Sequence, residues 1–475
     1  MPEALVIAIV GHTNAGKTSL LRTLTRQVDF GQVSDRPGTT RHAEAIELRL
    51  DGSKAVRFID TPGLEDSVAL LEYLQQLDGD TRAAKVRVFL AGPEARASFE
   101  QEAKVLRALT GEADAAMLVI DTREPVLPKY RAEIEILGSC AKPLMPVLNF
   151  VRDAGSRRSD WHQALLDSGL HARVEFDVVA PFVGAERQLY ADLATLLPAR
   201  RQQLNDIVDA LALQARERRL AACRVVAGCL IDVAAMRRAL PAEQFEDALR
   251  QQAFVRAFQD DVRRHARRAV DDLLAVYAFR PGDAELADLP QIDGRWEDDL
   301  FNAELLKAAG KRLGLGAAIG AGIGAVADLA MAGLSLGAAT TLGATLGGAA
   351  SGGWRPLWRK LENRLGGVQE LTAGDPVLLL LADHLLQLAQ ALDQRGHAAQ
   401  DKLHVAAATA APSGPDDDLH ALVRALGPAR GHPDWERGSG TGAASDADRE
   451  QLVAALARQL QQRIGRHEGA SRPAP

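Results

Sequence analysis

The sequence predicts an α/β domain, built as a three-layer sandwich around a mostly parallel sheet, followed by an all-α C-terminal domain with a glycine-rich hairpin. Two observations lead to this fold class. Continuous apolar runs at 5–10, 115–121 and 144–150 are typical of buried parallel strands and all lie in the first 200 residues. Aromatic residues make up only 4% of the 475 residues, while Ala, Leu and Arg abound, which favours helix over sheet beyond the first domain. We expect a first domain over 1–200 and a helical domain over 201–410. Residues 411–475 are expected to form a linker, short helices and a flexible tail.

A glycine-containing loop follows the first apolar run. Residues 11–18 read Gly-His-Thr-Asn-Ala-Gly-Lys-Thr, which fits the pattern G-x-x-x-x-G-K-[ST] of phosphate-binding loops. Gly11 and Gly16 allow the backbone N–H groups to turn inward toward a triphosphate. Lys17 would then reach the outer phosphates, Thr18 would offer a hydroxyl to Mg²⁺, and the helix that follows would direct its positive N-terminus at the anion. The predicted nucleotide contacts of this loop are Asn14, Ala15, Gly16, Lys17, Thr18 and Ser19.

The next segments extend the sheet and add a second phosphate motif. Runs at 45–50 and 55–59 predict two strands joined by the turn Asp51-Gly52. The second strand leads into Asp60-Thr61-Pro62-Gly63, where Asp60 can hold Mg²⁺ through water and Gly63 can present its N–H to a terminal phosphate. We expect further helices at 19–25, 68–77, 99–109 and 185–197, and further strands at 85–90 and 174–179.

Three short motifs resemble those of the Era/TrmE branch of bacterial P-loop GTPases, namely Asn-Ala-Gly-Lys at 14–17, Pro-Gly-Thr-Thr-Arg at 37–41 and Asp-Thr-Pro-Gly at 60–63. The resemblance implies a cytoplasmic enzyme that hydrolyses GTP to GDP and phosphate as a conformational switch. Thr40 would close onto Mg²⁺ when the γ-phosphate is present, and Asn14 would help to hold K⁺ beside the phosphates. The implied catalytic residues are Lys17, Thr40 and Gly63, and the implied Mg²⁺ ligands are Thr18, Thr40 and Asp60.

Members of this branch lack the water-positioning glutamine that follows Asp-x-x-Gly in other GTPases, and here Leu64 occupies that place. An apolar side chain cannot orient a water molecule, so another group must do so. K⁺, Glu65, Asp66 and a partner are the alternatives, and the sequence leaves them open.

The base-reading motif departs from the family. Where the family has Asn-Lys-x-Asp to read guanine, this chain has Asn-Phe-Val-Arg-Asp at 149–153, so that lysine is replaced and the aspartate arrives one residue late. We expect Asn149 and Asp153 to contact the base and Phe150 to stack on its face. Guanine is the predicted base, and adenine or relaxed specificity is the alternative.

Beyond residue 200, long amphipathic helices are predicted at 202–240 and 244–279. A basic run at 263–268 lies one turn from Asp260, Asp261, Asp271 and Asp272, so we interpret it as a solvated helix face rather than a nucleic-acid patch. Another helix is predicted at 377–394, short helices at 419–426 and 449–464, and a frayed tail from 465.

Between 313 and 353 the only charged residue is Asp328, and glycines recur at four-residue spacing, as at Gly316, Gly320 and Gly324. Because such a stripe lets two helices approach closely, the stretch predicts a helical hairpin. Basic flanks suit a hairpin that contacts the inner membrane from the cytoplasmic side, yet the first arm would span only about 22 Å of a roughly 30 Å hydrocarbon core. A membrane hairpin and a tightly packed hairpin inside a soluble domain therefore stay open.

Composition limits the class of function. The net charge of −7 and a pI of about 5.9 give no support for nucleic-acid binding by the chain as a whole, and three irregularly spaced cysteines fit a reducing cytosol. The primary interpretation is a GTP-hydrolysing switch coupled to its helical domain, with a homodimer through the GTPase domains as a further expectation. An RNA-associated GTPase in tRNA modification or ribosome maturation is one alternative. A nucleotide-binding scaffold with little turnover is the other.

Overall fold

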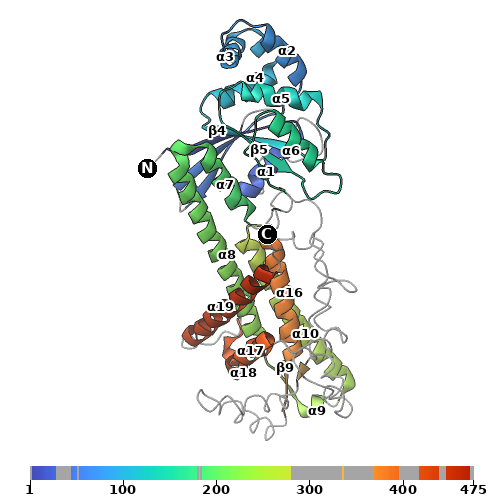
Figure 1. Ribbon diagram of the computed structural model, residues 1–475. Coiled ribbons are helices and arrows are strands. Elements are labelled where there is room, and N and C mark those ends of the chain that lie inside the picture. Colours follow the sequence, from blue (N-terminus) through green and yellow to red (C-terminus); the bar gives the residue numbers. More distant parts are fainter. Residues whose placement is uncertain are drawn as a thin grey trace. The chain divides into compact units, whose positions relative to one another are not determined.

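The computed structural model describes residues 3–27, 44–50, 53–178, 181, 184–245, 247–279, 334–335, 368–394, 417–437 and 446–470 (Figure 1). The chain divides into two compact units, one over Met1–Arg216 and Gln394–Asp401 and the other over Glu217–Asp393 and Lys402–Pro475. The predicted motif at 37–41, with Thr40, lies outside the described residues.

The first unit is built on a six-stranded sheet in the order β2-β3-β1-β4-β5-β6. Its strands are β1 (Leu5–Val10), β2 (Glu44–Leu50), β3 (Ser53–Asp60), β4 (Ala115–Asp121), β5 (Leu144–Asn149) and β6 (Val174–Glu175). Only the β2–β3 pair is antiparallel, and all other neighbours are parallel. The predicted, mostly parallel sheet is confirmed, although β6 ends earlier than the expected strand at 174–179.

Helices cover both faces of this sheet. Along β1, Leu5, Ile7 and Ile9 enter one hydrophobic core, and Ala8 and Val10 enter the other, as the two-residue period of a strand requires. The first core is closed by α1 (Lys17–Thr25), α7 (Ala185–Leu196) and the beginning of α8 (Arg201–Ala235). The second is closed by α2 (Ser67–Gln76), α4 (Glu100–Thr110), α5 (Pro128–Gly138) and α6 (Arg158–Asp167). The unit is therefore the predicted three-layer sandwich.

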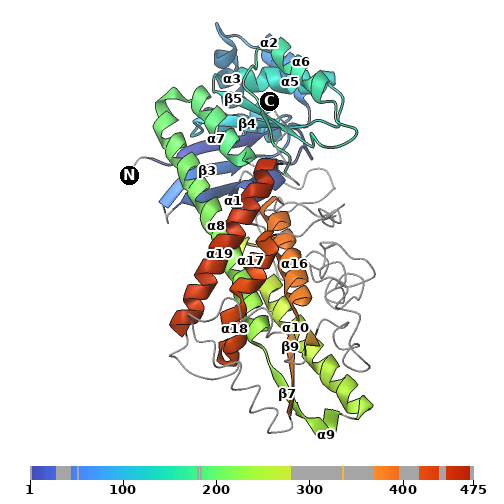
Figure 2. The ribbon, with the colours of Figure 1, turned by 60° about the horizontal axis from the view of Figure 1, so that its bottom comes forward.

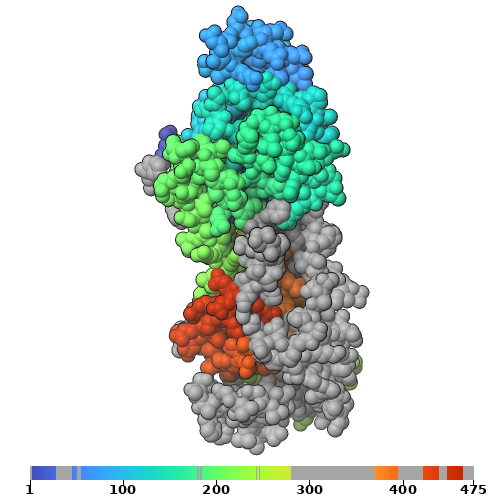
Figure 3. Space-filling model, in the orientation of Figure 1, coloured from blue at the N-terminus to red at the C-terminus, as the bar shows by residue number. Residues whose placement is uncertain are grey.

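The strand predicted at 85–90 is wrong. The chain forms α3 (Arg82–Ala91) there, followed by the short η1 (Glu94–Arg96). Thr81 caps the helix by accepting a hydrogen bond from the N–H of Ala84, and Val86 and Phe89 are buried at the three-residue spacing of one helical face. The segment that carries α2 and α3, blue in Figure 3, protrudes at one end of the first unit.

The second unit is largely helical, as predicted. The part of α8 beyond Arg216 shares one hydrophobic core with α10 (Ala248–Val276), α16 (Asp375–Gln394), α17 (Asp417–Ala425) and α19 (Asp446–Ala470). Short elements complete it, namely α9 (Ala242–Phe245), α18 (Gly427–Gly431) and η4 (Pro433–Trp435), while η2 (Pro198–Arg200) precedes α8 in the first unit. The predicted tail is partly wrong, because α19 continues as helix to Ala470.

A small antiparallel sheet corrects the all-α prediction for this region. β7 (Arg238–Pro241) pairs with β9 (Val368–Ala373), which pairs with β8 (Leu334–Ser335). Figure 2 shows β7 beside β9. The predicted helix to residue 240 therefore ends at Ala235, because the following backbone groups bond to β9 instead.

Of the glycine-rich stretch at 313–353, only the two residues of β8 are described, and they form a strand rather than helix. The predicted hairpin otherwise lies outside the described residues. None of the helices in the described part of the chain has the length and apolar character that a membrane crossing requires.

One buried ion pair and one partly buried ion pair connect elements of the second unit. Asp232 accepts a hydrogen bond from Arg449 (2.6 Å), and both side chains are less than a tenth exposed. Glu436 accepts from Arg238 at 2.8 and 2.9 Å and contacts His265 at 3.3 Å. Burial raises the pKa of Glu436, but these hydrogen bonds outweigh it and lower the pKa to about 2.

The basic run on α10 matches its interpretation as a balanced helix face. Arg263 pairs with Asp260 and Arg264 with Asp261, each at 2.9 Å and one turn apart.

Candidate functional site

The phosphate-binding loop lies between β1 and α1, at the carboxyl end of the central strand. Gly11 has φ 133°, and a Cβ there would lie 2.4 Å from the carbonyl oxygen of Val119 on the neighbouring strand β4. Gly16, directly before α1, has φ 96°. Both conformations strain any other residue, so the two glycines of the motif are explained by backbone geometry.

Lys17 points into this loop. Its side chain is buried, and Nζ donates hydrogen bonds to the carbonyl oxygens of Gly11 (3.0 Å) and His12 (2.8 Å). Burial lowers the pKa of Lys17, and the carboxylates of Asp60 and Glu133 act in the opposite direction. The ammonium group thus lies at the centre of a loop whose N–H groups are suited to bind phosphate.

Two predicted magnesium ligands, Thr18 on α1 and Asp60 at the end of β3, meet beside the loop. Thr18 Oγ1 donates to Asp60 Oδ2 at 2.6 Å. The contact forms because β3 pairs in parallel with β1 in the register Ile9↔Asp60, which brings the end of β3 to the phosphate loop. A hydroxyl and a carboxylate are the hard oxygen donors that Mg²⁺ prefers, so this pair fits the ion.

Gly63 lies directly against the loop. A Cβ at this position would be 2.3 Å from Thr13 Oγ1 and 2.6 Å from Thr13 N. The turn is held to β1 by Thr61, whose hydroxyl donates to the Ile9 carbonyl at 2.6 Å. The predicted role of Gly63, an N–H offered to a terminal phosphate, therefore has the close backbone approach that it needs.

A carboxylate on α4 fixes the backbone of the residues after Gly63. Leu64 is 0% exposed and belongs to the core between the sheet and α5. The buried carboxylate of Glu102 on α4 accepts hydrogen bonds from the N–H groups of Glu65 (3.1 Å) and Asp66 (3.0 Å). Asp66 in turn caps α2 by accepting from the N–H of Ala69. Of the two predicted carboxylate alternatives for orienting water, one therefore caps a helix and the other, Glu65, is exposed.

On the base side, Asn149 ties three segments together. Its Nδ2 donates to the Ala15 carbonyl (3.0 Å), and its Oδ1 accepts from the N–H groups of Phe150 (2.9 Å) and Val178 (3.1 Å). The side chain is 0% exposed, so the amide holds the phosphate loop against the loop after β6. Asp153 is exposed, and its Oδ1 accepts from the backbone N–H two residues later at 2.8 Å.

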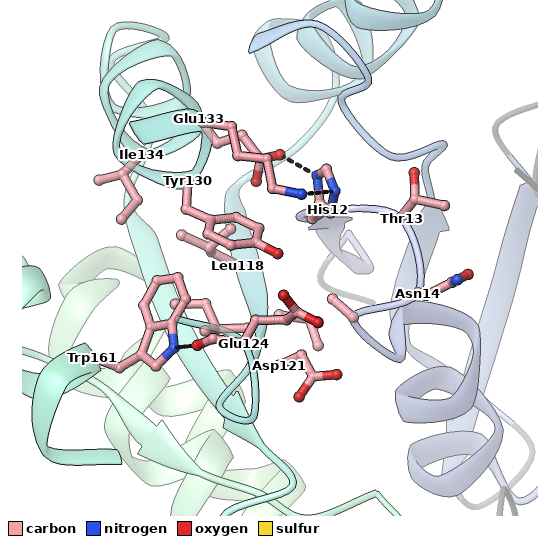
Figure 4. A pocket seen from close by; sticks show the side chains of 14 residues that line it. His12, Thr13, Asn14, Leu118, Asp121, Glu124, Tyr130, Glu133, Ile134 and Trp161 are labelled. Carbon is pink, nitrogen blue, oxygen red and sulfur yellow. Dashed lines mark hydrogen bonds and ion pairs between the residues drawn. The ribbon is translucent and has the colours of Figure 1, made fainter. Parts of the chain in front are cut away.

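A cavity of about 200 Å³ lies beside the loop and carries a charge network that the sequence analysis missed (Figure 4). His12 contacts Glu133 Oε1 through Nδ1 (2.7 Å) and Lys129 Nζ through Nε2 (3.0 Å), and both partners come from α5. An ammonium group only donates, so Nε2 accepts and Nδ1 carries the proton that is donated to Glu133. Tyr130 and Trp161 pack edge to face across the cavity. The signals that could have found this network are a histidine inside the phosphate loop and the four-residue spacing of Lys129 and Glu133.

Two family models match the chain. Residues 6–150 match a family described as 50S ribosome-binding GTPase. Residues 162–458, more than half of the chain, match a family described as a domain of unknown function, DUF3482. The chain belongs to the DUF3482 family. Its N-terminal part is an Era/TrmE-like P-loop GTPase domain, as the motifs predicted.

Two curated relatives of this DUF3482 protein match only part of the chain. The tRNA modification GTPase MnmE of Roseobacter denitrificans is 41% identical over 113 residues, which cover 23% of this chain and 26% of that protein. The GTPase Der of Azorhizobium caulinodans is 32% identical over 146 residues, which cover 31% and 26%. The chain thus spans about a quarter of the length of these relatives.

Among solved structures, Aquifex aeolicus Era bound to GDP and AlF4⁻ is 21% identical, with a TM-score of 0.26 and coverage of 36% of this chain and 50% of that chain. The G domain of the T. maritima FeoB iron transporter is likewise 21% identical, with a TM-score of 0.23 and coverage of 37% and 88%.

Proposed function

We propose that this DUF3482 protein binds GTP with Mg²⁺, hydrolyses it to GDP and phosphate, and uses the nucleotide state as a switch for its helical C-terminal region. The single observation that carries the proposal is the buried ammonium of Lys17, held by two carbonyls inside the loop with the Thr18–Asp60 pair beside it. A buried cation in a nest of backbone groups at a helix N-terminus is suited to a polyphosphate.

In the proposed reaction, water attacks the γ-phosphorus and the bond to the β–γ bridging oxygen breaks. Negative charge spreads over the phosphoryl oxygens as this happens, so catalysis requires positive charge and N–H donors fixed in advance. Lys17 and the loop N–H groups supply them from one side, and the N–H of Gly63 from the other. Mg²⁺, held by Thr18 and Asp60 with Thr40 as the proposed third ligand, would neutralise phosphate charge when bound.

Asn14 is the proposed potassium contact. It is exposed on the loop and has φ 66°, a conformation that asparagine tolerates better than most residues. It lies at the edge of the cavity beside the phosphate loop (Figure 4). K⁺ there would add positive charge near the transferred phosphoryl group.

Guanine remains the proposed base, and a scaffold with little turnover is the second candidate. Replacement of lysine by Phe150 favours this second candidate, because it leaves base reading without its usual group. The family description of ribosome-binding GTPases and the relatives named for tRNA modification motivate the RNA-associated alternative.

Turnover of GTP and ATP by the full chain in KCl, with and without Mg²⁺, tests the proposal. We expect Lys17→Ala to abolish nucleotide binding or hydrolysis, and Thr18→Ala to lower mainly the Mg²⁺-dependent rate. Lys104→Ala is the matched control, because Lys104 is a surface lysine that pairs with Glu100 one turn away. Unchanged affinity and turnover in Lys17→Ala would refute the proposed site. Tight binding without turnover in the wild type would instead support the scaffold.

Two further proposals concern dimerisation and membrane contact. If the protein forms a homodimer through its GTPase domains, its molecular mass in solution should depend on the bound nucleotide. Light scattering in the presence of GDP or a non-hydrolysable GTP analogue would measure this mass. Contact of 313–353 with membrane predicts flotation with liposomes in one of these nucleotide states, and a protein that never floats would refute it.

A further inference from the structure

Phe150 occupies the position where the base-reading motif has lysine, and its surroundings are specific. Its backbone has φ 58°, an unusual conformation for an aromatic residue, and its N–H donates to Asn149 Oδ1. The guanidinium carbon of Arg123 lies 3.7 Å from the centroid of the Phe150 ring. This is a close cation–π contact between residues from the ends of two neighbouring strands.

Arg123 is fixed in this place by its own strand end. Its Nε donates to Asp121 Oδ1 at 3.0 Å and its Nη2 donates to Asp121 Oδ2 at 2.7 Å, a bidentate pair with the last residue of β4. Bidentate pairing orients the planar guanidinium as well as holding it. The orientation of the Arg123 guanidinium over the Phe150 ring is therefore fixed without a bound ligand.

The two loops that carry these side chains are interlocked. Thr122 Oγ1 donates to the Asn149 carbonyl (2.7 Å), Ser156 Oγ donates to Thr122 Oγ1 (3.0 Å), and the N–H of Arg157 donates to the Thr122 carbonyl (2.7 Å). Asn149 also bonds the phosphate loop through Ala15. The segments that carry Arg123 and Phe150 are thus linked to the phosphate loop through hydrogen bonds of Thr122 and Asn149.

We propose that Arg123 and Phe150 together form the wall on which the purine base of the bound nucleotide stacks. Arg123 covers one face of the Phe150 ring, and the base takes the other. Arg123, two residues beyond the end of β4, thereby supports the aromatic ring that replaces the lysine of the motif after β5. Ligands of α/β sheets bind beyond the carboxyl ends of the strands, and β4 and β5 follow β1 in the sheet order, so the wall lies along that edge. The inference rests on the proposed function and adds Arg123 to it as a positioning residue that acts through Phe150.

The wall makes a particular prediction about selectivity. Every base has a π-face, so stacking strengthens binding without distinguishing guanine from adenine. Loss of Arg123 should therefore weaken GDP and ADP binding by the same factor. A residue that reads the base edge, as proposed for Asp153, should change their ratio instead.

The experiment is a double-mutant cycle on the full chain, with Kd measured for fluorescent GDP and ADP analogues. We expect Phe150→Ala to raise both Kd values by about 5- to 150-fold, the range of base–aromatic stacking. Arg123→Ala should raise both by about two- to fivefold, as for an exposed cation–π contact, and should have no further effect in the Phe150→Ala background. Phe150→Leu, which keeps the apolar volume, should behave like Phe150→Ala.

Arg157→Ala is the matched control, because Arg157 is exposed on the same loop and its side chain approaches Asp160 only at 3.9 Å. Its Kd values should equal those of the wild type. If Arg123→Ala leaves both Kd values unchanged, or if its effect adds fully to that of Phe150→Ala, the wall is refuted while the proposed GTPase stands. If the wild type binds neither nucleotide, both proposals are wrong.

Discussion

Removing the carboxylate of Glu133 should loosen the phosphate loop. Glu133 is 2% exposed and accepts a hydrogen bond from His12 Nδ1 at 2.7 Å. The His12 carbonyl in turn accepts a hydrogen bond from Lys17 Nζ at 2.8 Å. Glu133→Ala would leave this N–H without an acceptor, which costs about 1–3 kcal/mol for a buried group. Because the His12 side chain is 22% exposed, water would replace part of the lost bond, and we expect the lower half of that range.

Hydrogen exchange of the backbone amides over 13–17 in the full chain measures the effect. A loss of about 1–2 kcal/mol corresponds to exchange roughly 5- to 30-fold faster, since 1.4 kcal/mol is a factor of ten. Glu133→Gln separates hydrogen bonding from charge, because an amide oxygen still accepts from His12. This variant should retain most of the protection.

Glu135→Ala is the control for Glu133→Ala. Glu135 lies on the same helix, its side chain is 41% exposed, and it meets Arg82 only at 3.7 Å, so exchange at 13–17 should match the wild type. Wild-type exchange in Glu133→Ala as well would refute the reasoning. It would mean that the loop is held without its contact to α5.

Four further outcomes are expected. K⁺ should stimulate turnover well above Na⁺, and Asn14→Ala should remove this stimulation, as steady-state rates in matched KCl and NaCl would show. Leu64→Gln should lower the melting temperature without raising turnover, because it buries an amide in an apolar core. The pKa of Glu436 is lowered to about 2 from an ordinary 4.5, so its ionised form contributes stability that is present above pH 4.5 and lost as the pH falls toward 2. In Glu436→Gln the melting temperature should therefore depend less on pH over that interval. Asp232→Ala should destabilise the second unit by about 3–5 kcal/mol in denaturant unfolding, since it leaves Arg449 buried without its carboxylate.

The sequence was sufficient for the sheet and the phosphate loop because their signals are local. Apolar runs such as 5–10 and 115–121 specify buried strands, and the glycine spacing of 11–18 specifies one loop conformation. The contact of Thr18 with Asp60 was also predictable from the sequence, because β1 and β3 are adjacent parallel strands whose carboxyl ends lie together.

Long-range pairing explains most of what the sequence did not predict. Residues 238–240 continue a helical pattern, yet they form β7 because a partner strand more than 100 residues later offers hydrogen bonds. The run at 85–90 alternates weakly like a strand, but the Thr81 cap and the burial of one helical face decide for α3. Glu102 gave no signal at all, because its role depends on where α4 packs.

Neither Leu64 nor Asp66 is placed to activate the attacking water. Leu64 is fully buried, so a polar replacement would face the core rather than the phosphates. The Glu102 carboxylate fixes the backbone of the next two residues, and the capping role of Asp66 directs its carboxylate to the start of α2. Reorienting that segment would break the partly buried, charge-assisted hydrogen bonds to Glu102, each worth about 1.5–3 kcal/mol. Of the alternatives, a monovalent cation beside Asn14, the exposed side chain of Glu65 and a group from a partner remain, because each can act while these backbone hydrogen bonds stay intact.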